Sequence, residues 1–118
     1  MEKKEMTLKD ASSRSVTKSE ILIFLESVKK RPGMYVQDYQ SYDGVTAYLG
    51  GYFMCLCQLY RQLFSPHVMS IWYHQINKDS KGVILLSAAI KNNNSDLSEE
   101  QLIRVYIETV IDYVKARG

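Results

Sequence analysis

The sequence lacks the patterns that mark common catalytic centres. No G-x-S-x-G elbow is present to hold a nucleophile, and no glycine-rich phosphate loop follows an expected strand. The two histidines, His67 and His74, lie seven residues apart with no acidic residue or cysteine between them to complete a metal site. We therefore expect no enzymatic activity, no metal and no cofactor. Both histidines are interpreted as surface or helix-end residues, and an enzyme that uses either of them is the least favoured alternative.

Long apolar segments are also absent. No run approaches the roughly 18 residues of a membrane span, and the N-terminal region has no apolar segment of the kind found in secretion signals. We therefore expect a cytoplasmic protein that does not enter a membrane. The only cysteines, Cys55 and Cys57, would point about 200° apart on a helix, so they are poorly placed to pair or to share a metal. They are expected to be small apolar core residues.

Positive charge is not concentrated enough to indicate a nucleic-acid partner. The net charge is +2, from 15 basic and 13 acidic residues. Domains that bind nucleic acid usually carry a dense basic face. We therefore expect a partner that is neither nucleic acid nor membrane.

The patterning that is present predicts an all-α or nearly all-α fold. With 118 residues, of which 46% are hydrophobic, the chain is expected to bury a core without help from a metal or a disulfide. Residues 1–15 carry few large apolar side chains and are expected to form a loose N-terminal arm. Residues 16–118 are expected to form a compact single-domain helical bundle.

Two helices are predicted with clear starting signals. Thr17 with Glu20 forms a capping box that starts a helix over 17–30, and Pro32 disfavours the α conformation of the residue before it. Ser98 with Gln101 forms a second capping box for a helix over 98–116. This last helix is apolar on most sides, so it must be packed within the fold or against another subunit. Its charges form one narrow exposed stripe: Glu100, Arg104, Glu108 and Asp112.

The middle of the chain predicts two more helices and leaves one segment open. A helix over 44–64 has its apolar stripe at Val45, Leu49, Tyr52, Leu56, Leu59 and Leu63. Gly50 and Gly51 interrupt it, and close approach of another backbone is the simplest compensation. Ser65 and Pro66 start a short helix over 66–77, followed by a turn over 78–82. The apolar run 83–90 is either a helix or an extended segment, and Asn92 to Asn94 are expected to form a polar loop. The residues expected to be most buried are Tyr52, Leu56, Trp72, Tyr106 and Val110.

The connection between the first two helices carries both the main motif and the candidate binding residues. The motif Arg31, Pro32, Gly33, Met34 and Tyr35 is expected to be structural, with Gly33 free to adopt a positive φ and Arg31 able to bond helix-end carbonyls. Met34 and Tyr35 are expected to fold back on the first helix, and a buried Tyr35 would cost about 3–5 kcal/mol on replacement by alanine. Loop 36–43 then combines tyrosine with carboxylate at Asp38, Tyr39, Tyr42 and Asp43. These residues either contact a protein partner or cap the core from the loop.

A similar R-P-G-M-Y string occurs near the N-terminus of the ATPase domain of type II topoisomerase subunits. There it precedes a much longer nucleotide-binding fold with an acidic helix motif and glycine-rich lids. Neither feature is found here, and the chain is too short to contain that fold. ATP binding is therefore not expected.

A second resemblance covers about residues 17–116. The sequence resembles a family of small bacterial α-helical proteins in which R-P-G-M-Y precedes an aromatic-glycine helix, a short tryptophan-bearing helix, a turn ending in glycine and an apolar C-terminal helix. The matching parts are Arg31–Tyr35, Tyr48–Tyr52, Trp72, Gly82 and residues 98–116, while Val83 replaces an aromatic residue expected after the glycine. Members of such families resemble immunity proteins for polymorphic toxins, including contact-dependent growth-inhibition toxins.

This resemblance implies a protein that binds a cognate toxin, such as a nuclease domain, and occludes its active site. The alternative is a homo-oligomeric structural or regulatory protein whose apolar helix 98–116 forms a homodimer. The neighbouring open reading frame distinguishes the two, because an immunity protein is expected beside the gene of a secreted toxin.

Overall fold

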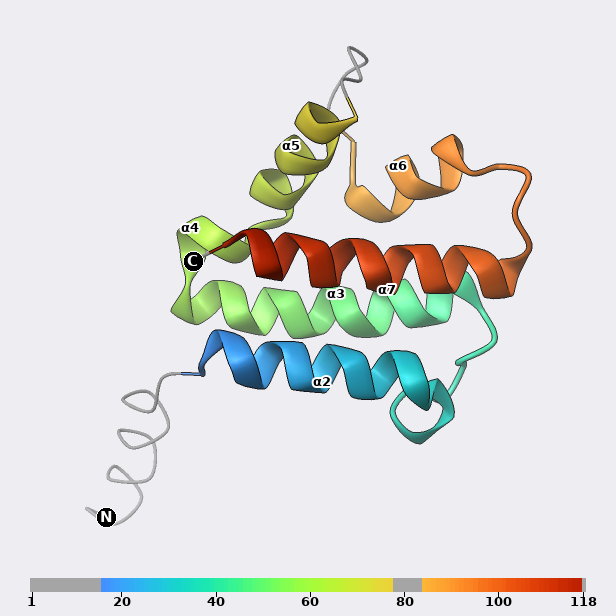
Figure 1. The fold of residues 1–118 in the computed structure, drawn as a ribbon, viewed down its shortest axis with the longest axis horizontal. Helices are drawn as coiled ribbons and strands as arrows, with labels where there is room; N and C mark the ends of the chain where they lie inside the picture. The colour runs from blue at the N-terminus through green and yellow to red at the C-terminus, as the bar shows by residue number, and fades with distance from the viewer. Residues whose placement is uncertain (1–15, 78–83, 118) are drawn as a thin grey trace.

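The all-α fold is confirmed. The computed structural model describes residues 16–77 and 84–117, and these residues form helices and no strand (Figure 1). The expected N-terminal arm (1–15) and the expected turn (78–82) lie outside the described residues, as does Val83. None of the helices in the described part of the chain combines the length and the apolar character needed to cross a membrane.

Three long helices form the body of the bundle: α2 (Lys18–Lys30), α3 (Tyr42–Leu59) and α7 (Glu99–Ala116). Helix α2 runs antiparallel to the other two and packs against α7 (Figure 1). A 3₁₀ turn, η1 (Pro32–Met34), follows α2. The short helices α4 (Arg61–Phe64), α5 (Pro66–Ile76) and α6 (Leu86–Asn93) complete the fold, with α5 and α6 on the side of α7 away from α2 (Figure 1).

The predicted helix starts are confirmed. Both capping boxes form, with the Thr17 hydroxyl accepting from the Glu20 amide and the Ser98 hydroxyl accepting from the Gln101 amide. The Ser65 hydroxyl accepts from the Val68 amide and so caps α5, with Pro66 in the first turn. These caps act over three residues, which is why the local sequence predicts them.

The single helix predicted over 44–64 is wrong, because the chain leaves the α conformation at Tyr60 (φ −130°, ψ 64°). The Phe53 and Phe64 rings stack with their centroids 5.8 Å apart. In a continuous helix, residues eleven apart would be separated by about 16 Å along the axis. The break therefore folds α4 back so that Phe64 packs on α3. The Tyr60 hydroxyl donates to the Val16 carbonyl, 2.9 Å away.

The sequence left open whether the apolar run 83–90 is a helix or an extended segment, and the structure answers this from Ile84 onward. Ile84 and Leu85 are exposed and non-helical, and α6 begins at Leu86. The helix continues to Asn93, so the polar loop predicted from Asn92 to Asn94 is wrong for its first two residues. The Asn93 side-chain amide donates to the Tyr73 hydroxyl at 3.0 Å, and this contact stabilises the end of α6 against α5.

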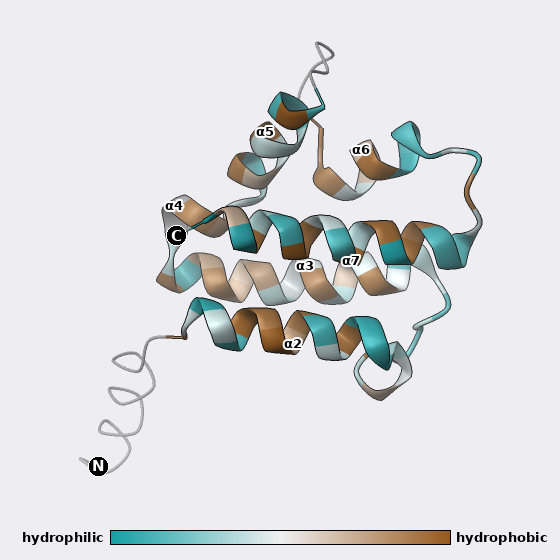
Figure 2. Ribbon diagram, in the orientation of Figure 1, coloured by the Kyte–Doolittle hydropathy of each residue, from teal (hydrophilic) through white to brown (hydrophobic). Residues whose placement is uncertain are grey.

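The prediction of the most buried residues is confirmed for three of the five. Leu56, Tyr106 and Val110 are buried, whereas Tyr52 and Trp72 are only partly buried. Helices α2 and α7 show brown apolar and teal hydrophilic bands in alternation, as expected for amphipathic helices (Figure 2). On α3 the buried residues differ from the predicted apolar stripe. Phe53 is buried, whereas Leu59, which was part of the predicted stripe, is exposed. Leu63, on α4, is also exposed.

Helix α7 buries its apolar residues within this chain. Eight of its side chains are buried against the rest of the fold: Leu102, Ile103, Tyr106, Ile107, Val110, Ile111, Tyr113 and Val114. The predicted stripe of Glu100, Arg104, Glu108 and Asp112 is exposed, as expected. The apolar surface expected to form a homodimer through residues 98–116 is therefore already covered by α2, α3 and α6.

Two further expectations for α3 are wrong. A Cβ added at Gly50 or Gly51 would meet nothing within 4 Å, so within the described part of the chain no other backbone approaches either glycine. Cys55 is exposed and Cys57 is partly buried, so Cys55 is not a core residue. The reason is geometric, since the buried positions of α3 lie on the opposite side of the helix from Cys55.

Candidate protein-binding surface

The connection between α2 and α3 is held in a defined conformation. The Arg31 amide donates to the Ser27 carbonyl and ends α2, so a backbone group rather than the Arg31 side chain makes the helix-end bond. The amides of Tyr35 and Val36 both donate to the Pro32 carbonyl, and the Ser41 amide donates to the Asp38 carbonyl. These bonds leave little freedom between the two helices.

Buried side chains anchor this connection at both ends. Val36 is 4% exposed and Tyr42 is 2% exposed. The Tyr42 hydroxyl donates to the Ser87 carbonyl on α6 at 2.6 Å. Burial, together with the nearby Tyr106, raises the pKa of Tyr42 above the ordinary tyrosine value, so the hydroxyl stays neutral. Tyr42 is therefore a core residue, and it does not lie on the surface with the other predicted binding residues.

The remaining predicted binding residues do lie on the surface. Asp38, Tyr39 and Asp43 are exposed, and Tyr39 packs its ring beside Gly33. Gly44 allows the loop to lie close to α3, since a Cβ at this position would be 2.5 Å from the Asp38 carbonyl oxygen. This contact holds Asp38 next to the first turn of α3, where Asp43 lies. Asp38, Tyr39 and Asp43, with the neighbouring Met34 and Tyr35, are called the loop surface below.

Two expectations for the R-P-G-M-Y motif are wrong. Gly33 does not adopt a positive φ, because the 3₁₀ turn requires none. Met34 is 70% exposed and does not fold back on the first helix. Tyr35 is 38% exposed and contacts α2 only by an edge-on approach to Phe24, with the ring centroids 5.7 Å apart.

Sequence reasoning missed an aromatic cluster that extends the loop surface. Phe24 lies between Tyr35 and Tyr52, with its ring centroid 4.5 Å from that of Tyr52. Burial, and then the charge of Glu20, raises the pKa of Tyr52. Phe24 and Tyr52 are partly buried, whereas Tyr48 on the next turn of α3 is exposed. The buried stripe of α2 consists of Ile21, Leu25 and Val28, and Phe24 lies outside it. This position was the signal that the Phe24 ring is available for contacts near the surface.

Replacing Tyr35 with alanine is expected to lower the free energy of unfolding by about 1 kcal/mol. An edge-to-face aromatic contact contributes about 0.5–1.5 kcal/mol, and a partly exposed ring loses less than a buried one. Chemical denaturation of the two proteins measures the difference. A loss near the 3–5 kcal/mol expected for a buried aromatic would show that Tyr35 packs into the core after all.

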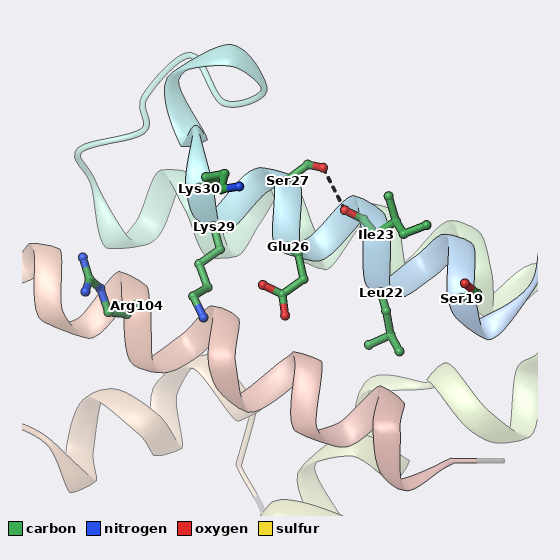
Figure 3. Close-up of a pocket in the computed structure, with 8 residues that line it drawn as sticks. All are labelled: Ser19, Leu22, Ile23, Glu26, Ser27, Lys29, Lys30 and Arg104. Carbon is green, nitrogen blue, oxygen red and sulfur yellow. Dashed lines mark hydrogen bonds between the residues drawn. The ribbon is translucent and has the colours of Figure 1, made fainter.

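A hollow lies between α2 and α7, with a volume of about 640 Å³. Leu22, Glu26 and Lys29 extend from α2 toward α7, while Ile23 turns away (Figure 3). The Lys29 ammonium pairs with the Glu108 carboxylate at 3.4 Å, so its charge is already partly neutralised. The hollow is open and is lined by both acidic and basic side chains. This mixture of charges does not favour a particular class of ligand.

The two histidines differ in solvent exposure. His67 is exposed, as predicted, but His74 is buried at the end of α5 and accepts a hydrogen bond from the Ile84 amide at 3.4 Å. The prediction of a surface or helix-end position is therefore met by His67 at the surface and by His74 at a helix end, although His74 is buried. Among the described residues, no three His, Cys, Asp or Glu side chains gather as metal ligands.

Comparison of the chain with protein-family models, curated proteins and solved structures finds no match. The loop surface is the part of the described chain where the predicted binding residues and exposed aromatic side chains occur together. It combines carboxylates with tyrosine and methionine, which are enriched at protein interfaces.

Proposed function

We propose that this protein is an immunity protein, which binds a cognate toxin and neutralises it by occluding the toxin's active site. The observation that carries the proposal is the loop surface, where exposed Asp38 and Asp43 occur in the same short connection as exposed Tyr35 and Tyr39. The resemblance of the R-P-G-M-Y motif and the following helix to bacterial immunity proteins supports the same function.

The chemistry of the loop surface fits a toxin that cleaves nucleic acid. Such a toxin needs a cationic cleft to bind phosphate, and carboxylates of an inhibitor compete for that cleft. Tyr35, Tyr39 and Met34 provide apolar contact area around the charges, as anchor residues do in protein interfaces. Because hydrogen bonds and the Gly44 contact already order the loop, binding does not have to order it.

The double variant Asp38→Lys with Asp43→Lys is expected to weaken toxin binding by about 100-fold or more and to slow association. Both carboxylates are exposed, so folding should remain intact apart from a helix-dipole loss of about 0.3–1 kcal/mol at Asp43. The measurement is calorimetry after co-expression with the protein encoded by the adjacent gene. Association rates are measured at low and high salt.

The control is the double variant Glu100→Lys with Asp112→Lys on α7. It changes the net charge equally, and Glu100 occupies the first turn of α7 as Asp43 occupies the first turn of α3. Its affinity should stay near that of the parent. Equal weakening by both variants would show that only net charge matters, and an adjacent gene without any toxin would contradict the immunity function itself.

The homo-oligomeric alternative has less support from the same structure. It relied on the apolar helix 98–116, whose apolar residues pack inside this chain. An oligomer would have to use another surface.

A further inference from the structure

A second feature of the fold is an apolar cavity at the junction of α3, α5, α6 and α7. Its volume is about 370 Å³, which lies within the range of small-molecule sites. Most of its lining is apolar, and the residues that matter below are Asp43, Gly50, Met54, Leu85, Ser87 and Tyr106. Met54 and Leu85 are exposed, so the cavity opens to solvent beside them.

One polar group in the cavity has no partner within the described chain. Tyr106 is 4% exposed and lines the cavity, yet its hydroxyl makes no hydrogen bond to a described residue. The neighbouring Tyr42 hydroxyl, in contrast, donates to the Ser87 carbonyl at 2.6 Å. The Tyr106 hydroxyl is not one of the fully buried unpartnered side-chain atoms of the described chain, so it remains accessible from the cavity. It is therefore available to donate a hydrogen bond to a ligand atom in the cavity.

The charge of the lining restricts the ligand further. Asp43 contributes a carboxylate to the lining, and among the side chains that the structure describes no lysine or arginine lines the cavity. An anionic ligand would place a second negative charge near Asp43, and none of these described side chains would balance it. Gly50 leaves the α3 side open, because a Cβ at this position would meet nothing within 4 Å.

We propose that this cavity binds a neutral, largely apolar small molecule that accepts one hydrogen bond from the Tyr106 hydroxyl. Medium-chain alcohols and ketones have this chemistry, whereas fatty-acid anions do not. Asp43 belongs to both this lining and the loop surface, but the proposal does not depend on toxin binding.

The first test uses the neutral dye N-phenyl-1-naphthylamine with the full chain. Its fluorescence is expected to rise on binding, and decanol is expected to displace it at lower concentration than decanoate does. Absence of a saturable fluorescence rise, or displacement by decanoate that equals displacement by decanol, would overturn the proposal.

The two adjacent glycines of α3 provide a matched pair of variants. Gly50→Leu places a side chain in the cavity, whereas Gly51→Leu makes the same change one residue away, outside the lining. Neither added Cβ meets a neighbour, so both variants should fold, which thermal melting checks. Dye binding is expected to fall at least tenfold in Gly50→Leu and to stay unchanged in Gly51→Leu. Equal affinity in the two variants would show that the dye binds elsewhere.

Tyr106→Phe tests the hydrogen bond. It removes the hydroxyl and keeps the ring, so decanol should compete about fivefold less well while dye binding persists. Unchanged competition by decanol would show that Tyr106 makes no bond to the ligand. If no dye binds and a co-expressed protein is retained by the parent but lost by Gly50→Leu, the cavity holds a protein side chain and the small-molecule proposal is wrong.

Discussion

Replacing Tyr113 with alanine is expected to lower the free energy of unfolding by about 3–5 kcal/mol. The Tyr113 side chain is fully buried, and its ring lies edge-on to Phe64 and Trp72, with centroid distances of 6.1 and 5.1 Å. Its hydroxyl also donates to the Leu63 carbonyl. The substitution therefore opens a cavity where α4 and α5 meet the end of α7, and it leaves a carbonyl without its donor. Chemical denaturation followed by circular dichroism measures the change.

The control is Tyr113→Phe, which keeps the ring contacts and removes only the hydroxyl. Its expected cost is about 1–2 kcal/mol, the range for one hydrogen bond whose other partner stays in place. A loss below about 1 kcal/mol for Tyr113→Ala would contradict the packing of α4 and α5 on the C-terminal half of α7.

Replacing Gly44 with valine is expected to cost about 3 kcal/mol or more, which is the upper end for overpacking. An added Cβ would lie 2.5 Å from the Asp38 carbonyl oxygen and 2.8 Å from the Asp38 Cβ. Since the first of these atoms belongs to the backbone, the loop must move away from α3. The displacement should also weaken any partner that binds the loop surface. Denaturation and a binding titration on the same variant measure the two effects.

The matched variant is Gly51→Val on the same helix. It meets no neighbour within 4 Å, so it should change stability little or raise it by a few tenths of a kcal/mol through helix propensity. If Gly44→Val and Gly51→Val had the same effect on stability, the close contact between Asp38 and the first turn of α3 would not exist in solution.

Part of the candidate surface was predictable because it depends on residues close together in the chain. Charged and amide side chains in a connection between helices are expected at the surface, and Asp38, Gln40 and Asp43 are found there. Tyr42 is the exception. Its partner is the Ser87 carbonyl, 45 residues away on α6, so no local pattern distinguishes Tyr42 from its exposed neighbours.

The same division holds for the helices. The sequence by itself determined where α2, α5 and α7 begin, because a capping hydroxyl and the amide that it accepts from lie three residues apart. Only the tertiary structure decided that the chain bends at Tyr60, because the bend brings Phe64 against Phe53 across eleven residues. It also decided which glycine is crowded. Gly44 faces a loop that folds back on it, while Gly50 and Gly51 have open space beside them, and this difference arises from packing between segments rather than from local sequence.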